Sequence, residues 1–258
     1  MVRSNQIKMG GETVKIISLI NQKGGVAKTT STLSLASALS KLEKKVLVID
    51  IDPQGNATTG AGINKTELKA TTFDLLLRSN QIEECITTNG VYDIIGTTIE
   101  LASAEYEMFN RFLRESLLRK KLQDKKYYDF VLIDCPPSLS LLTINALVAS
   151  DEVLIPVAPE PFALEGISQL IHTILKIREI NENLEIKSVF ITKFDQRKKT
   201  NIEIKEGLEK MFKDKLSKTI IRVSSDIEKG QFINKDIYEY SPKCNAAIDY
   251  MNLAKELI

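Results

Sequence analysis

Cysteine is scarce in this sequence. The 258 residues contain three, Cys85, Cys135 and Cys244, and no two of them form a C-x-x-C pair. An odd and sparse count excludes a disulfide framework and indicates a reducing compartment. The closely spaced cysteines that would bind an iron–sulfur cluster are also missing. We therefore expect three free, buried thiols.

Long apolar segments are equally absent. Residues 1–13 lack the apolar core of a secretory signal, and no window is apolar for long enough to span a bilayer. Internal repeats, low-complexity tracts and Pro/Gly-rich linkers are not found either. We expect a cytoplasmic protein with a flexible N-terminal tail over residues 1–13 and one domain over residues 14–258.

The net charge is also small. It is +1 at neutral pH, with 27% charged and 43% apolar residues, which is ordinary for a soluble globular protein. A charge this close to zero gives no uniform attraction to nucleic acid. Any affinity for DNA or RNA must therefore come from local patches.

Apolar runs alternate along the chain with longer amphipathic stretches. The runs are mostly continuous, as expected for strands buried on both faces of a parallel sheet. The predicted strands are Val14–Ile20, Val46–Asp50, Tyr92–Ile95, Phe130–Asp134, Val153–Val157, Ser188–Thr192 and Thr219–Val223. The predicted helices are Thr29–Leu42, Thr72–Arg78, Ala104–Gln123, Leu139–Val148, Leu164–Ile180, Ile202–Phe212 and Ala246–Leu257. This alternation predicts a single doubly wound α/β domain, whose mostly parallel sheet is flanked by helices and binds ligands at the carboxyl ends of its strands.

The stretch Asn21–Thr30, N-Q-K-G-G-V-A-K-T-T, joins the first predicted strand to the first predicted helix. A strand, a glycine turn and a helix N-terminus together gather backbone N–H groups around phosphates. Lys28 is placed to reach the outer phosphates, and the Thr29 hydroxyl to ligate Mg²⁺. The usual pattern G-x-x-x-x-G-K-[ST] is altered, because Gln22 and Ala27 occupy its glycine positions.

A second lysine, Lys23, stands five residues before Lys28. The resulting form, K-G-G-x-x-K-T, is a deviant Walker A motif and resembles the ParA/MinD group of P-loop ATPases. The resemblance implies that Lys23 crosses a dimer interface to the nucleotide of the partner subunit. We expect Ala27 to be tolerated with a negative φ. The implied nucleotide-binding residues are Lys23, Gly24, Gly25, Val26, Ala27, Lys28, Thr29 and Thr30.

Two further motifs place aspartates at the ends of predicted strands. V-L-V-I-D-I-D-P-Q-G-N-A-T carries Asp50 and Asp52, and Y-D-F-V-L-I-D-C-P-P-S-L carries Asp134. Matched to the family's motifs, Asp52 is the catalytic aspartate that orients the attacking water. Asp134 closes a Walker B strand and would bind Mg²⁺ together with Thr29. Asp50 is expected to be structural, and the plainer alternative for these carboxylates is that they cap turns or helices.

Three later segments distinguish the branches of the group. T-I-N-A-L at Thr143–Leu147, F-A-L-E-G at Phe162–Gly166 and L-A-K-E-L at Leu253–Leu257 look like ParA-type partition ATPases. The resemblance implies an ATP- and Mg²⁺-dependent sandwich dimer that binds DNA nonspecifically, associates with the nucleoid and segregates a chromosome or plasmid. A centromere-binding ParB-type partner would stimulate its ATP hydrolysis. A ParA-like positioner of a protein cargo would keep the same catalytic residues Lys23, Lys28 and Asp52.

Other branches match less well. About a dozen residues precede the first predicted strand, which is too few for the helix-turn-helix domain of larger ParA proteins. MinD-like division regulators end in a basic helix that lies on a membrane. Residues 246–258 carry one lysine, Lys255, against Asp249 and Glu256. We therefore expect no membrane partner.

The expectation of DNA binding depends on local charge. From Lys193 to Arg222 there are ten basic and five acidic residues. Arg197, Lys198 and Lys199 fall in a predicted loop, where long side chains can reach phosphates without reading bases, and Arg222 is the fourth candidate. The family's arginine-rich stretch is altered here, because Asp226 and Glu228 follow Arg222. Solvated helix faces are the alternative, also for a second basic stretch over residues 111–126.

Overall fold

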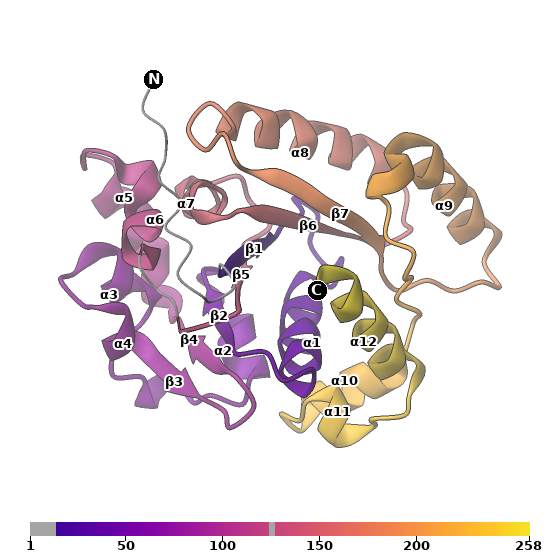
Figure 1. Cartoon of the computed structure of the whole chain (residues 1–258), viewed down its shortest axis with the longest axis horizontal. Helices are drawn as coiled ribbons and strands as arrows, with labels where there is room; N and C mark the ends of the chain where they lie inside the picture. Colours follow the sequence, from indigo (N-terminus) through magenta and orange to yellow (C-terminus); the bar gives the residue numbers. More distant parts are fainter. Residues whose placement is uncertain (1–13, 124–126) are drawn as a thin grey trace.

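Seven strands form one sheet within residues 14–123 and 127–258, which the computed structural model describes (Figure 1). The strand order is β3-β4-β2-β5-β1-β6-β7, and neighbours are parallel except β3 and β4. The strands are β1 (Lys15–Leu19), β2 (Val46–Asp50), β3 (Ile86–Thr88), β4 (Asp93–Ile95), β5 (Phe130–Asp134), β6 (Glu152–Val157) and β7 (Glu185–Ile191). The predicted doubly wound, mostly parallel fold is therefore confirmed. The tail expected over residues 1–13 lies outside the described residues.

Helices cover both faces of this sheet (Figure 1). They are α1 (Lys28–Lys41), α2 (Asn56–Gly60), α3 (Thr72–Leu77), α4 (Ile82–Cys85), α5 (Ala104–Met108), α6 (Leu117–Leu122), α7 (Leu141–Ala149), α8 (Ala163–Ile177), α9 (Lys199–Phe212), α10 (Ser225–Phe232), α11 (Ile237–Tyr240) and α12 (Asn245–Leu257). Helices α1, α3, α7, α8, α9 and α12 begin and end within three residues of the predicted bounds.

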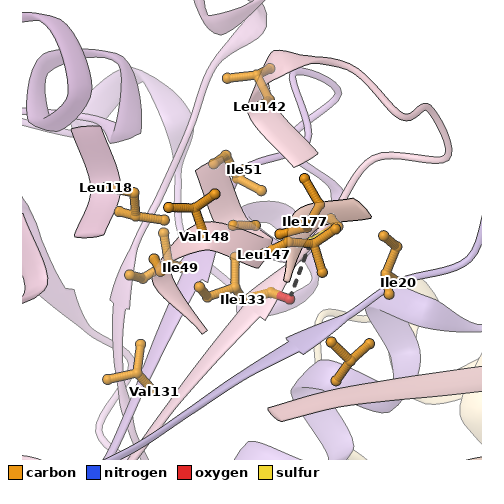
Figure 2. Close-up of a cluster of buried hydrophobic side chains, with 14 of the residues drawn as sticks. Ile20, Ile49, Ile51, Leu118, Val131, Ile133, Leu142, Leu147, Val148 and Ile177 are labelled. Carbon is orange, nitrogen blue, oxygen red and sulfur yellow. Dashed lines mark hydrogen bonds between the residues drawn. The ribbon is translucent and has the colours of Figure 1, made fainter. Parts of the chain in front are cut away.

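Two apolar cores lie on the opposite faces, because successive strand side chains point to opposite sides. In β2, Val46 and Val48 pack with α1 and α12, whereas Leu47 and Ile49 pack with α3, α6, α7 and α8. All four side chains are at most 3% exposed. Figure 2 shows part of the second core, with these side chains labelled: Ile20, Ile49, Ile51, Leu118, Val131, Ile133, Leu142, Leu147, Val148 and Ile177.

The prediction of a strand at Thr219–Val223 is wrong. This segment runs beside the residues that follow β7 and makes only an isolated bridge between Phe194 and Arg222. Its Ile221 is buried, which explains why the segment is apolar, but the backbone-to-backbone hydrogen bonds of the segment are with the last residue of β7, Ile191, and with Phe194 beyond it. The seventh strand of the sheet is the short β3, whose polar sequence I-T-T gave no apolar run.

The single helix predicted over Ala104–Gln123 is also wrong. The described chain breaks it into α5, a 3₁₀ turn at Arg114–Ser116 and α6, with Leu113 in the left-handed region at φ 54°. The buried amide of Asn145 on α7 holds the break, since it accepts from Leu118 N (3.2 Å) and donates to Arg114 O (2.8 Å). A distant side chain thus replaces the helical hydrogen bonds.

The middle of the sheet places the loops that carry the motifs. Strand β1 lies between β5 and β6, while the chain leaves β1 toward β2, so the direction of winding changes there. In open α/β sheets such a switch point, at the carboxyl ends of the strands, is where ligands bind. The loops after β1, β2, β5, β6 and β7 all lie at that edge.

The C-terminal helix α12 packs against α1 (Figure 1). Its apolar face is buried, with Tyr250 and Leu253 at 0% exposure, and the Tyr250 hydroxyl lies 2.9 Å from Ser31 Oγ. The face that a membrane-bound helix would present to lipid is therefore used inside the fold. Among the described residues, no helix has both the length and the apolar character to cross a membrane.

Candidate functional site

The loop after β1 ends in a helix terminus that lacks a side-chain cap. The first backbone bond of α1 runs from Ser31 N to Ala27 O, and no side chain caps the helix. The N–H groups of Lys28, Thr29 and Thr30 therefore have no partner within the helix. Uncapped N–H groups at the positive end of a helix dipole bind anions such as phosphate.

Ala27 is strained, contrary to the negative φ expected from the sequence. Its φ is 66° and its ψ is 33°, which is the left-handed conformation. A side chain in this region costs about 1–2 kcal/mol. Gly25, at φ 74°, adopts the same region without this cost. The turn thus has the backbone conformation that a glycine would adopt at position 27. The Ala27 methyl group is the difference from a glycine.

Thr29 and Asp134 meet at the end of β5. Thr29 Oγ1 donates to Asp134 Oδ2 at 2.7 Å, and Thr32 Oγ1 donates to Asp134 Oδ1 at 3.1 Å. Hydroxyl and carboxylate oxygens are the hard ligands that Mg²⁺ prefers. The two residues predicted to bind the metal are thus in direct contact, and their donor chemistry fits this ion.

Asp50 organises the loop that carries Asp52. Its carboxylate accepts from Asp52 N (3.2 Å), Thr58 N (2.8 Å) and Thr58 Oγ1 (2.7 Å). Gly55 turns this loop at φ 64°, and a Cβ there would lie 2.9 Å from Thr97 O. The side chain of Asp52 is 8% exposed and accepts from Gln54 N. Asp50 is therefore structural, as predicted, and it sets the position of Asp52.

Asp50 and Asp134 are register partners on adjacent strands and are completely buried. Burial raises the pKa of Asp134 to about 7, and the neighbouring Asp50 acts in the same direction. Burial also raises the pKa of Asp50 to about 6. A cation bound beside this pair would stabilise its ionised form.

The two lysines of the loop occupy different environments. Lys28 is 8% exposed, and its Nζ donates to Lys23 O at 3.2 Å. Burial lowers the pKa of Lys28, and the charge of Asp134 opposes this shift. The Lys23 side chain turns to the loop after β6, where its Nζ lies 2.7 Å from Glu160 Oε2.

A cavity of about 600 Å³ opens above these groups. The phosphate loop and Asp52 form part of its wall, and Pro137, from the loop after β5, closes another side. A second hollow of about 230 Å³ shares part of this wall and reaches toward Arg222 and Tyr250. The residues common to both are Ala27, Thr30, Lys193 and Gln231. The two hollows are neighbouring parts of a depression beside the phosphate loop, and the uncapped start of α1 forms its anion-binding end.

The sequence motifs did not identify the wall formed by α10. Gln231 Nε2 donates to Thr30 Oγ1 at 3.2 Å, so α10 closes over the start of α1. Asn234 and Glu228 also line the depression. No spacing rule links these positions to the phosphate loop, because more than 190 residues separate them in sequence and only the fold brings them together.

The basic loop lies between β7 and α9, at the same edge of the sheet. It ends at Lys198, because Lys199, which is also predicted to lie in a loop, is the first residue of α9. The side chains of Arg197 and Lys199 are 83% and 91% exposed. Arg197 donates Nε and Nη2 to Asp195 (2.9 and 2.8 Å), which holds the pKa of Asp195 at about 2. Thr192 Oγ1 donates to Val26 O at 3.0 Å and ties this loop to the phosphate loop.

Arg222 is in a different setting from Arg197 and the lysines that follow it. Its guanidinium donates Nε and Nη2 to the two carboxylate oxygens of Asp249 on α12, at 2.9 and 2.7 Å. The Arg222 side chain is 44% exposed, while that of Asp249 is 8% exposed. Arg222 thus forms an ion pair beside the smaller hollow. The second basic stretch is described only as far as residue 123.

A sequence model described as an AAA domain matches residues 14–186. The sporulation initiation inhibitor protein Soj of Bacillus subtilis is 43% identical over 247 residues, covering 94% of this chain and 98% of that protein. The chromosome partitioning protein ParA of Myxococcus xanthus is 38% identical over 248 residues, covering 95% of this chain and 88% of that protein.

Solved structures share the fold over the same range. A putative plasmid partition protein from Borrelia burgdorferi bound to AMPPNP has a TM-score of 0.81 and 29% identity, covering 95% of this chain and 98% of its own. Cobyrinic acid a,c-diamide synthase from Mycobacterium smegmatis, with bound ADP and magnesium, has a TM-score of 0.82 and 29% identity, covering 95% and 94%.

Proposed function

Because the chain belongs to the ParA family of P-loop ATPases, we propose that it is a partition ATPase that binds and hydrolyses ATP with Mg²⁺. The observation that carries this proposal is the meeting of three separate motifs at one cavity. The uncapped start of α1 and the loop after β2 supply Lys28, Thr29 and Asp52 to it, and the end of β5 supplies the buried Asp134, which accepts a hydrogen bond from Thr29. Each motif provides a different part of phosphoryl-transfer chemistry.

The anion-binding end holds the phosphates of ATP. Backbone N–H groups of the loop and the Lys28 ammonium neutralise the β- and γ-phosphates. Mg²⁺ would be held by Thr29 and Asp134 and would offset further phosphate charge. The smaller hollow, toward Arg222 and Tyr250, leaves room for the rest of the nucleotide.

Asp52 orients the attacking water. It lines the cavity, and Asp50 fixes its backbone through the loop hydrogen bonds. In such a site, rate enhancement comes mainly from positioning and charge stabilisation. Hydrolysis by a single subunit is slow in this proposal, because Lys23 points away from the cavity toward Glu160.

ATP therefore drives formation of a dimer in which Lys23 of each subunit reaches the nucleotide of the other. The basic loop, with Arg197, Lys198 and the adjoining Lys199, lies at the edge of the sheet that carries the site. We propose that it contacts DNA phosphates without base specificity, in the dimer. A ParB-type centromere-binding partner stimulates hydrolysis and releases the dimer from DNA, which moves a chromosomal or plasmid cargo.

The test is to measure oligomeric state and DNA binding under the same nucleotide conditions. Analytical ultracentrifugation should show a dimer with a non-hydrolysable ATP analogue and Mg²⁺, and a monomer with ADP. Two DNA fragments of unrelated sequence should be retarded equally, and only under the dimer condition. DNA binding that is independent of nucleotide, or a monomer in every condition, would contradict the proposal. An adjacent gene for a ParB-like protein would favour DNA partition over positioning of a protein cargo.

A further inference from the structure

Lys23 is held by the loop between β6 and α8. Its Nζ forms an ion pair with Glu160 Oε2 at 2.7 Å and donates to Pro161 O at 3.2 Å. Both contacts lie within one subunit. Lys23 is not among the residues that line the described cavity, although its neighbours Gly24 and Gly25 are. A single subunit thus directs this ammonium away from its own nucleotide.

The loop that presents Glu160 is anchored on both sides. Asn21, two residues before Lys23, donates Nδ2 to Pro156 O at 2.8 Å. Asn201, at the start of α9, is 5% exposed and donates Nδ2 to Pro159 O at 3.2 Å. Glu160 N also bonds Ala158 O at 2.8 Å. The carboxylate is therefore carried by a fixed turn that is tied to the base of the lysine's own loop.

The turn also exposes a strained apolar residue. Phe162 is 82% exposed and adopts φ 64°, in the left-handed region, where it begins α8. Strained backbone and exposed aromatic groups collect at functional surfaces. Glu160 thus lies between Lys23, to which it is paired, and the exposed Phe162, at the edge of the sheet that carries the nucleotide site.

We propose that Glu160 is a positioning residue that holds Lys23 within its own subunit until a second subunit's nucleotide takes its place. The inference rests on the proposed function, because it assumes that Lys23 acts across a dimer. The Lys23 and Glu160 side chains are 38% and 48% exposed, and such ion pairs contribute little to stability. The triphosphate of a facing subunit carries more negative charge than one carboxylate and can displace it. The ion pair thus raises the protein concentration that is needed for the dimer to form.

The test compares Glu160→Gln with Glu165→Gln, which removes the same charge from an exposed position in the first turn of α8. With a non-hydrolysable ATP analogue, Glu160→Gln should dimerise at a protein concentration about two- to fivefold lower than wild type. Glu165→Gln should match wild type, and Glu160→Asp should restore most of the wild-type value. ADP affinity of the monomer should be unchanged in all three variants. An unchanged or higher dimerisation concentration for Glu160→Gln overturns the inference.

A second measurement examines the ion pair without any dimer. Lysine-ammonium NMR of the nucleotide-free monomer should show a Lys23 signal, assigned by its loss in Lys23→Arg, that shifts or broadens in Glu160→Gln. An unaffected signal overturns the inference but not the proposed function. A wild-type protein that stays monomeric with the ATP analogue, while the NMR signal responds, overturns the proposed function and this inference with it.

Discussion

Thr29 Oγ1 donates a 2.7 Å hydrogen bond to Asp134 Oδ2, across 105 positions of sequence. The contact joins the first turn of α1 to the end of β5, the two elements that carry the phosphate loop and the buried aspartate. It forms because β1 and β5 are parallel neighbours, with Leu19 opposite Asp134 in the register. A hydroxyl and a carboxylate at this distance form the centre of the proposed Mg²⁺ site.

Replacing Lys28 by alanine should abolish ATP binding and ATP-dependent DNA binding together. Lys28 is the buried cation of the cavity, so its loss leaves the outer phosphates without their main counter-charge. Equilibrium binding of a fluorescent ATP analogue and DNA gel shifts measure the two effects. Lys41→Ala, at the other end of α1, is the control and should retain both. A Lys28→Ala variant that still retards DNA only with ATP would show that the site is misassigned.

Asp52→Ala should leave an ATP-bound dimer that hydrolyses poorly. The residue lines the cavity but makes no contact with Thr29 or Asp134 that the described structure records, so nucleotide and metal binding should survive. We expect turnover to fall by about tenfold or more, as for loss of a group that orients the attacking water. Phosphate release gives the rate, and sedimentation with ATP gives the oligomeric state. Monomer alone in ATP would argue against this role.

Changing Arg197, Lys198 and Lys199 together to alanine should weaken DNA binding equally across unrelated sequences. Each lost phosphate contact lowers the salt dependence of binding, and the loss of two or three should reduce affinity by about tenfold or more at moderate salt. Arg197 is held by two short hydrogen bonds to Asp195, whereas Lys199 lies 3.9 Å from its partner Glu203, so the two lysines should account for most of the effect. Gel shifts at several salt concentrations measure it.

The matched control removes three cations from α6, Arg119, Lys120 and Lys121. That variant should bind DNA as wild type does. If the α6 variant were weakened and the loop variant were not, the DNA-binding surface would lie on the second basic stretch instead.

The stability of the nucleotide-free protein should fall as pH rises through the range in which Asp50 ionises. Burial raises its pKa to about 6 in the folded state, from an ordinary value of 3.8. The folded protein therefore holds this proton more tightly than the unfolded chain. Its contribution to the free energy of unfolding is fully present below about pH 4 and is lost as pH rises through about 6.

Urea unfolding at intervals from pH 5 to pH 8, without Mg²⁺, measures this effect. The Asp50→Asn variant lacks the titrating carboxyl, so its unfolding free energy should vary less with pH than that of wild type. Part of the slope should remain in the variant, because burial also raises the pKa of Asp134. Identical slopes for the two proteins would be inconsistent with a protonated, buried Asp50.

The three thiols should react at different rates in the native protein. Cys85 and Cys135 are 1% exposed, and burial raises the pKa of Cys85 to about 11 and that of Cys135 further. Cys244 is half-buried, not fully buried as expected, and its Sγ accepts from Ala247 N at the start of α12. Ellman's reagent at pH 8 should modify one thiol rapidly and the others only after unfolding. Cys244→Ser should remove the rapid phase, and two rapid thiols in wild type would contradict the structure.

The class of fold follows from the sequence alone, because continuous apolar runs alternating with amphipathic stretches suit a parallel sheet covered on both faces. The glycine-rich loop after β1 and the aspartates at the ends of β2 and β5 could also be recognised from sequence, since each motif occupies a few consecutive residues. The conformation of Ala27 was not predictable in this way. Alanine ordinarily adopts a negative φ, and the packing of the whole turn imposes the positive value despite its cost.

Which distant groups meet depends on the three-dimensional fold. Asn145 breaks a helix that local periodicity favours, and Asp249 pairs with the guanidinium of Arg222, one of the predicted DNA contacts. Glu160 meets Lys23 because β6 lies beside β1, so that the loops following both strands emerge at the same edge. Side-chain partners of this kind depend on strand order, and strand order is fixed by long-range packing that no short window of sequence contains.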